Sequence, residues 1–205
     1  MAKQETKKAI IREGAQLIHS KGFNNTGIQE ILQAVGVPKG SFYFYFKNKE
    51  DFGLQIVDYF EQTMLRVAET YLTDRDLPPL MRMKNFFNAY RTHFEKTGCR
   101  QGCPIGNLTQ EMSDLSEVFR KRIASIYRRI TTNIETCIRD AQVRGDIALT
   151  LNSKDVADFI LDSWEGAVMR MKLDKTTRPL ALFEKYLFDT LLASYPGNAG
   201  HTGTY

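Results

Sequence analysis

The sequence lacks the features of a secreted, membrane-spanning or disulfide-bonded protein. It contains only three cysteines among 205 residues, and a small, odd number argues against a disulfide framework. No apolar run is as long as a membrane span, and residues 1–8 lack the apolar stretch of a signal peptide. We therefore expect a cytoplasmic protein that has no membrane partner.

Motifs for catalysis and metal binding are also scarce. Cys99 and Cys103 have a C-x-x-x-C spacing with no second cysteine pair, so we expect no zinc site. No glycine-rich phosphate loop is present. An enzyme with Cys103 as its nucleophile would need a base, and of the three histidines only His93 is expected to lie near it. We expect no catalytic residue, no metal and no cofactor, and keep the enzyme as the alternative.

Signals for β-structure are absent as well, since the sequence has no sustained alternation and no Asn-Gly or Asp-Gly hairpin. Apolar residues recur with helical spacing instead, which predicts an all-α fold. Asn48 and either Asn152 or Ser153 are expected to cap helices. Three helices are expected over about residues 6–21, 26–35 and 39–45, and a long one from 48 to a break at 74–79. Further helices are expected around 83–94, briefly after Pro104, and over about 116–145, 152–171 and 179–194.

The positive charge is confined to one end of the chain. Residues 1–50 contain eight lysines and arginines against four acids, which gives +4, whereas residues 51–205 contain twenty of each. The whole net charge of +4 therefore lies in the first quarter. A basic head on a neutral body suggests that the head alone binds a polyanion.

The basic head contains a helix-turn-helix pattern. The T-x-x-Q sequence of Thr26–Gln29 is a capping box that predicts a short helix ending near Val35. Gly36–Pro38 predicts a tight turn, and a second short helix is expected over 39–45. This is the arrangement in which the second helix enters the major groove of DNA.

The second helix of this pattern combines inward and outward groups. Phe42 and Phe46, four residues apart, are expected to face the core. The outward residues could contact bases or phosphates, and they are Lys39, Gly40, Ser41, Tyr43, Phe44 and Tyr45. Thr26 and Lys49 begin the flanking helices, where backbone N–H groups attract phosphate. An aromatic run alone is more typical of a core segment, but polar and basic residues surround this one.

The head resembles the TetR family of regulators over about residues 6–52. The resemblance rests on Thr26, Ile28, Ile31, Ala34, Gly36, Val37, Gly40, Phe42, Tyr43, Tyr45, Phe46, Lys49, Glu50 and Phe52. The helix pattern of the remaining chain is similar to the family's ligand-binding and dimerising body. The stretch from Gly98 to Leu115 looks like the subgroup that responds to reactive electrophiles and acrylate.

The resemblance implies a homodimer that binds palindromic double-stranded operator DNA, usually as a repressor released by a small-molecule inducer. We expect a three-helix DNA-binding domain over 1–50, a ligand-binding and dimerisation domain over 51–195, and a disordered tail over 196–205. The implied DNA contacts are Lys39, Ser41, Tyr43, Tyr45 and Lys49, with Thr26 at a phosphate. Because residue identity varies in the family at Pro38-Lys39, the operator sequence does not follow from the resemblance.

Several residues of the body are candidates for sensing a signal. Cys103 stands between Gly102 and Pro104 at an expected helix start, where the pKa of a thiol is lowered, so it could sense oxidants or electrophiles or be a buried, inert residue. Cys137 falls on an apolar stripe and is expected in the core. The other ligand or sensor candidates are Tyr90, Tyr127, Trp164 and Lys172. The residues that could serve either a dimer-spanning four-helix bundle or their own core are Trp164, Val168, Phe183, Leu187 and Leu191.

Overall fold

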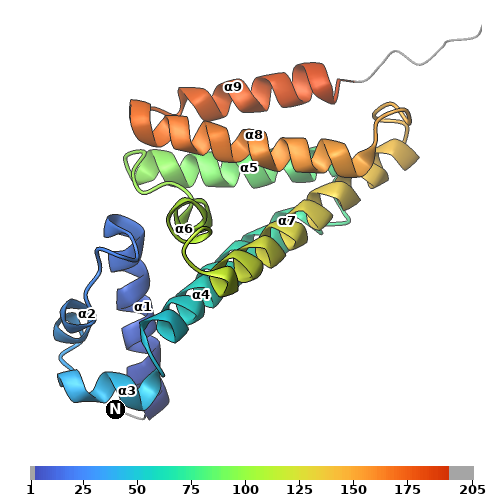
Figure 1. Ribbon diagram of the computed structural model, residues 1–205. Helices are drawn as coiled ribbons and strands as arrows, with labels where there is room; N and C mark the ends of the chain where they lie inside the picture. Colours follow the sequence, from blue (N-terminus) through green and yellow to red (C-terminus); the bar gives the residue numbers. More distant parts are fainter. Residues whose placement is uncertain (1–2, 194–205) are drawn as a thin grey trace, which may run out of the picture. The chain divides into compact units, whose positions relative to one another are not determined.

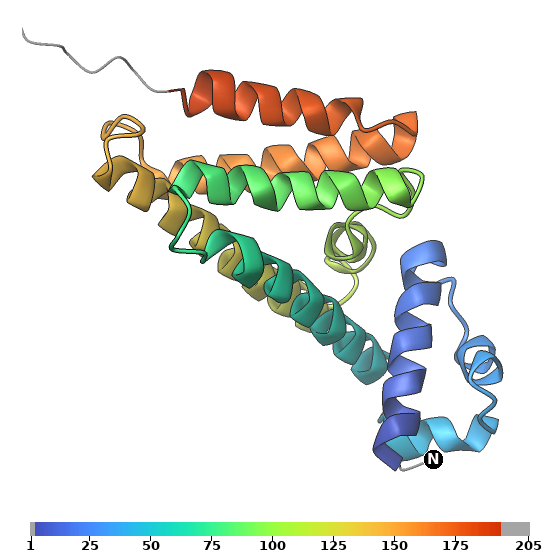
Figure 2. The same ribbon diagram turned by 180° about the vertical axis from the view of Figure 1, so that it is seen from behind.

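The computed structural model describes residues 3–193, and over that range the chain is all-α, as predicted, without strands (Figures 1 and 2). It divides into two compact units that share the long helices α4 (Lys49–Leu72) and α7 (Glu117–Val143). The first unit contains the chain up to Val67 together with Arg100–Arg129, and the second contains Ala68–Cys99 together with the chain from Ile130. No helix within 3–193 is long and apolar enough to cross a membrane.

The first unit is built around α1 (Lys3–Lys21) and the beginning of α4. Gly14 of α1 lies against the ring of Phe52, because a Cβ at this glycine would come within 2.3 Å of the ring. Gly22 ends α1 with a φ of +89°, a conformation that favours glycine. The remaining elements of this unit are α2 (Ile28–Ala34), the 3₁₀ turn Lys39–Ser41, α3 (Phe42–Tyr45), α6 (Pro104–Met112) and the first part of α7.

The capping box predicted at Thr26 is wrong. Helix α2 begins at Ile28, with Gly27 as its N-cap residue and no hydrogen bond from a capping side chain. Thr26 is instead fully buried, and its hydroxyl donates to the carbonyl oxygen of Gly22 at 2.7 Å. The T-x-x-Q pattern therefore marks the approximate start of α2, while the threonine serves the preceding turn.

An ion-pair cluster joins α4 to α7 within the first unit. The carboxylate of Glu61, only 6% exposed, pairs with Arg122 and lies 2.8 Å from Nη1 of Arg129. Arg122 also lies 2.7 Å from the carboxylate of Asp58. Burial works to raise the pKa of Glu61, but the hydrogen bonds and charges of the two arginines outweigh it and hold that pKa below its usual value.

Aromatic rings form the centre of the second unit. The ring centroid of Phe87, which is fully buried, lies 4.9 Å from that of Trp164 and 5.0 Å from that of Phe183. These rings come from α5 (Pro79–Lys96), α8 (Ser153–Asp174) and α9 (Arg178–Tyr186), which lie side by side in Figures 1 and 2. The burial of the rings holds the three helices together.

Most of the predicted helix ends are found in the structure. The Oδ1 atom of Asn152 accepts hydrogen bonds at the start of α8, and Oδ1 of Asn48 accepts one at 2.8 Å from the N–H of Asp51 in α4. Helix α6 is the short helix expected after Pro104. The last helix was expected to reach Ser194, but its α-helical part ends at Tyr186 and a π turn, Leu187–Leu191, follows. The tail expected over 196–205 lies outside the described residues.

We predict that Glu61→Gln lowers the free energy of unfolding at neutral pH by about 1–3 kcal/mol, because glutamine lacks the charge that both arginines face. Since the folded pKa of Glu61 is lowered, its charge stabilises the fold above the unfolded pKa, and this contribution is lost as the pH falls through the folded pKa. Thermal unfolding from pH 7 to pH 3 should show the Tm difference from the native protein shrinking towards acid.

The control for this prediction is Glu117→Gln. Glu117 is exposed and pairs with Arg120, three residues further along the same helix. Exposed ion pairs contribute little to stability, so the control should barely change Tm at neutral pH. A Tm difference for Glu61→Gln that stays constant over the whole pH range would contradict the role assigned to its charge.

Candidate nucleic-acid interface

The second helix of the helix-turn-helix pattern is short, and a tight turn separates it from α2. Gly36 has a φ of +68°, which lets the chain reverse after α2 without a side-chain clash. Pro38 follows in an extended conformation, and one 3₁₀ turn, Lys39–Ser41, leads into α3, Phe42–Tyr45. The expected helix over 39–45 is therefore present, with its first turn wound more tightly than an α-helix.

Three phenylalanine rings anchor this short helix. Phe42 and Phe52 are fully buried and Phe46 is 2% exposed. Their ring centroids lie 5.1 Å (Phe42–Phe46), 5.6 Å (Phe42–Phe52) and 4.9 Å (Phe46–Phe52) apart. Burying such a ring stabilises a fold by about 1.5–3 kcal/mol. Phe42 and Phe46 thus face inward, as the sequence predicts.

The opposite face of the same segment is exposed. Tyr43 and Phe44 are 69% and 62% exposed, in contrast to the buried anchors on either side. These large aromatic side chains keep most of their surface exposed, which is typical of a surface that contacts a partner. The same segment carries the other predicted contact residues, the exposed Lys39 and Gly40 and the half-buried Ser41 and Tyr45.

Two lysines of α1 add positive charge beside this face. The Nζ atom of Lys3 lies 3.9 Å from the ring centroid of Phe44, and that of Lys7 lies 5.5 Å from the ring centroid of Phe46. Sequence reasoning did not assign these lysines to the interface, because they stand about forty residues before α3 in the chain. Their four-residue spacing at the start of a helix, which places both on one face, is the signal that could have found them.

Two predicted phosphate contacts are placed differently. Thr26 is fully buried, and its hydroxyl is bonded to Gly22, so its side chain has no surface with which to reach a phosphate. The Nζ atom of Lys49 lies 4.8 Å from the ring centroid of Phe23 and 3.4 Å from the carbonyl oxygen of Asn24. Burial lowers the pKa of Lys49, against the opposing charge of a nearby glutamate. Lys49 therefore makes contacts inside the head.

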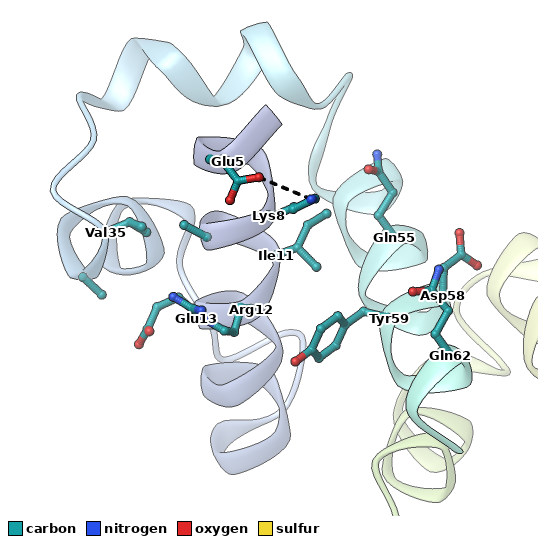
Figure 3. A pocket seen from close by; sticks show the side chains of 12 residues that line it. Glu5, Lys8, Ile11, Arg12, Glu13, Val35, Gln55, Asp58, Tyr59 and Gln62 are labelled. Atoms are coloured by element: carbon teal, nitrogen blue, oxygen red, sulfur yellow. Dashed lines mark hydrogen bonds and ion pairs between the residues drawn. The ribbon is translucent and has the colours of Figure 1, made fainter. Parts of the chain in front are cut away.

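A hollow of about 800 Å³ lies between α1, the end of α2 and α4 in the same unit, and Figure 3 shows it from close by. Its lining contains three acids and two bases, and one acid, Glu5, pairs with Lys8 at 3.3 Å. This mixture of charges gives no preference for a polyanion. The lysines beside α3 therefore suit DNA better than this hollow does.

An apolar groove of about 550 Å³ lies on α8 and α9 in the second unit. Large apolar side chains on these two helices are half or more exposed, namely Phe159, Met169, Leu173, Leu182 and Tyr186. Of the residues with two open roles, Trp164 and Val168 are buried in their own core, and Leu191 lines the groove. Leu187 and Phe183 do both, because Leu187 is buried and Phe183 packs against Trp164 while each also lines the groove. The two helices thus provide both a core face and an exposed apolar face.

The three cysteines differ in their surroundings, and none forms a disulfide. Cys103 is the half-buried N-cap residue of α6, and its Sγ accepts a hydrogen bond from the N–H of Gly106 at 3.3 Å. Cys137 is fully buried and lies 3.4 Å from the carbonyl oxygen of Leu72, to which its thiol donates. Burial raises the pKa of Cys137 to about 11. Cys99 is buried in the loop after α5.

The other sensor candidates are divided between the two units. Tyr127 is half-buried on α7 in the unit that contains Cys103. In the second unit, the ring centroids of Tyr90 and Trp164 lie 6.2 Å apart, and Lys172 is exposed near the end of α8. The structure therefore brings Tyr90 and Trp164 into one aromatic cluster. No group of histidine, cysteine or acidic residues among residues 3–193 is arranged to hold a metal ion.

Comparison with known proteins gives the same picture over nearly the whole chain. The family "Bacterial regulatory proteins, tetR family" matches residues 10–56, and "Tetracyclin repressor-like, C-terminal domain" matches residues 79–187. The chain is 35% identical to the HTH-type transcriptional repressor DhaR of Mycobacterium sp. (strain GP1), over 95% of this chain and 96% of that one. It is 34% identical to the transcriptional regulator AcuR of Cereibacter sphaeroides, over 87% and 81% of the two chains.

A solved structure matches equally well. The crystal structure of a regulatory protein TetR from Rhodobacter sphaeroides superposes with a TM-score of 0.82 and 34% identity, covering 87% of this chain and 94% of that one. Matches at both ends of the chain agree with the exposed helix-turn-helix segment and the helical body. The chain belongs to the TetR family of bacterial regulatory proteins and is a DNA-binding transcription regulator rather than an enzyme.

Proposed function

We propose that this protein is a homodimeric repressor that acts in the cytoplasm, binds a palindromic operator in double-stranded DNA, and releases it on a small-molecule or electrophile signal. The observation that carries the proposal is the exposure of Tyr43 and Phe44 directly above the buried Phe42 and Phe46. A relative that is 35% identical over almost its whole length is named a transcriptional repressor, which supports repression.

The proposed division of roles gives DNA binding to residues 1–50 and ligand binding and dimerisation to 51–195. On the recognition segment, Lys39 reads a base edge, Ser41 and the two tyrosines hold phosphates, and Phe44 meets thymine methyl groups. Gly40 leaves room for the backbone to approach the DNA, because nothing lies within 4 Å of its Cβ position. The basic side chains that neutralise phosphates beside it are Lys3, Lys7 and Lys47.

We predict that Lys39→Ala and Tyr43→Phe weaken operator binding in different ways. Loss of a base contact by Lys39→Ala should remove about 1–3 kcal/mol of discrimination between the operator and single-base variants. Loss of the phenol hydroxyl in Tyr43→Phe should weaken binding to all sequences alike, because phosphates carry no sequence information. Gel-shift titrations with the protein's own upstream DNA and a set of operator variants measure both effects.

The matched control for these variants is Lys84→Ala, which removes an exposed lysine of α5 far along the chain from the head. It should leave affinity and discrimination unchanged. Equal discrimination by Lys39→Ala and the native protein would reject the base-reading role. Failure of the native protein to shift any upstream fragment would reject the proposed function as a whole.

The exposed apolar face of α8 and α9 is the proposed dimer interface. Two recognition helices must be held about 34–36 Å apart to reach successive major-groove faces of a palindrome. A large apolar interface between copies can hold this spacing, and residues such as Met169 and Leu182 supply the exposed apolar area. The groove that Phe183 and Leu191 help to line would be filled by the second copy.

We predict that Met169→Glu converts the dimer to monomers at micromolar concentration and weakens operator binding at least about tenfold, since burying an unpaired charge at an apolar interface costs several kcal/mol. Leu149→Glu is the control, because Leu149 is 78% exposed but lies in the turn before α8, outside the two helices of the proposed interface. Analytical ultracentrifugation of both variants checks the prediction. A Met169→Glu protein that remains dimeric would place the interface elsewhere.

Cys103 is the proposed site at which an electrophile acts, with Tyr90, Tyr127, Trp164 and Lys172 as candidate ligand-binding residues.

We predict that N-ethylmaleimide alkylates Cys103 well before Cys137, because Cys137 is fully buried and its pKa of about 11 leaves almost no thiolate at neutral pH. Peptide mass spectrometry gives the order, and gel shifts give the release of DNA. If N-ethylmaleimide releases operator from Cys103→Ser as readily as from the native protein and from Cys99→Ser, Cys103 is not the sensor. The proposed signal is then a noncovalent ligand.

A further inference from the structure

The carboxylate of Glu111, in the last turn of helix α6, makes the two shortest hydrogen bonds between α6 and the turn that joins α1 to α2, and the side-chain amide of Asn24 adds a longer one to Sδ of Met112 at 3.8 Å. The Oε2 atom of Glu111 accepts a hydrogen bond from the backbone N–H of Phe23 at 2.8 Å. Its Oε1 atom accepts one from the backbone N–H of Asn24 at 2.6 Å. The three residues belong to the same compact unit, although nearly ninety positions separate Glu111 from the turn. Both oxygens of one carboxylate thus bind two consecutive N–H groups.

The turn is shaped to receive this carboxylate. Gly22 has a φ of +89°, and its N–H closes the last turn of α1 on the carbonyl of Ile18 at 2.8 Å. The next two N–H groups then point together, and consecutive N–H groups after a left-handed residue form a concave site for an anion. A Cβ at Gly22 would lie 3.0 Å from Oε2 of Glu111. Glycine therefore permits both the backbone conformation and the close approach of the acid.

A second contact attaches the other end of α6 to the same unit. The Nε2 atom of His19, in α1, lies 3.0 Å from the carbonyl oxygen of Gly102. Because a carbonyl oxygen only accepts, Nε2 is the protonated nitrogen and donates this bond. Gly102 directly precedes Cys103, the N-cap of α6. The head therefore contacts α6 at two places, just before the first turn of α6 through His19 and in its last turn through Glu111.

The turn held by Glu111 leads directly into the helix-turn-helix. The ring of Phe23 is 5% exposed and its centroid lies 5.2 Å from that of Phe119, and Nζ of Lys49 lies 4.8 Å from the same ring centroid. A Cβ on Gly53 would come within 2.4 Å of this ring, so Phe23 has no room to shift against α4. The direction in which the chain leaves Asn24 sets the position of α2, and the recognition segment follows α2 in the chain.

We infer that Glu111 is a positioning residue for DNA binding, through which α6 sets the α1–α2 turn directly and transmits a change at its own N-terminus to the helix-turn-helix. The inference rests on the proposed function for its readout in DNA binding. Charge-assisted hydrogen bonds to backbone N–H groups are about twice as strong as neutral ones. A displacement of α6 must therefore either carry the turn with it or break both bonds.

The first test uses full-length Glu111→Ala and Glu111→Gln, with Glu117→Gln as the control because Glu117 pairs only with neighbours on its own helix among the contacts described for it. Amide hydrogen exchange on the DNA-free protein should be at least about tenfold faster at Phe23 and Asn24 in Glu111→Ala. Glu111→Gln, which keeps one accepting oxygen, should lie between. Operator affinity should fall about tenfold in Glu111→Ala, measured well below its Tm, where the variant remains folded and dimeric.

Protection of both amides in Glu111→Ala, or an operator affinity within twofold of the native value, would overturn the inference. The exchange measurement needs no DNA, so it still reports on the contact if the proposed function fails. That separate failure would appear as an absence of operator binding by the native protein.

The second test separates transmission from simple support of the fold. If α6 and the head are coupled, saturating operator must change the reactivity of Cys103, because coupling between two sites is reciprocal. N-ethylmaleimide should alkylate Cys103 several-fold more slowly with operator than without it, in the native protein and in Glu117→Gln. In Glu111→Ala this dependence on DNA should disappear even when the operator is saturating. A dependence that persists in Glu111→Ala, or is absent from the native protein, would overturn the transmission.

Discussion

The DNA-binding head depends on the burial that holds its shortest helix in place. An isolated helix is marginal below about 12–15 residues, whereas α3 has four residues and one 3₁₀ turn before it. The rings of Phe42 and Phe46 against Phe52 provide the stabilisation that so few backbone hydrogen bonds cannot. The same burial decides what faces outward, since Tyr43 and Phe44 follow Phe42 by one and two residues and therefore lie on the other side of the helix.

Two acids, the buried Glu61 and the half-buried Glu111, connect separate elements of the first unit, and they do so in different ways. Glu61 faces Arg122 and Arg129, whose long side chains can adjust when α4 and α7 shift slightly. Glu111 instead binds two N–H groups of the backbone, which cannot move without moving the turn itself. The first arrangement tolerates small displacements, and the second converts a displacement of α6 into one of the chain that leads to α2.

Periodic apolar spacing was sufficient to predict the all-α fold, the order of the helices and the inward direction of Phe42 and Phe46, because these depend on neighbours within a few residues. Asn48 was recognised as a cap for the same reason. The role of Thr26 was not predicted, because a threonine hydroxyl just before a helix can bond either to the turn before it or to the helix after it. Glu111 gave no signal, since its partners stand nearly ninety residues earlier in the chain.

The position of Lys49 shows why charge in the basic head is not equivalent to contact with DNA. Its ammonium group lies over the ring of Phe23 and near Glu111, so part of its charge is already balanced inside the head. Counting every lysine of residues 1–50 as a phosphate contact would therefore overestimate the electrostatic part of the affinity. The charges that lie at or beside the exposed recognition segment are those of Lys3, Lys7, Lys39 and Lys47. Because two of these belong to α1, the orientation of α1 relative to α3 affects affinity as well as the fit of the recognition helix, and a contact that positions the end of α1 acts on both.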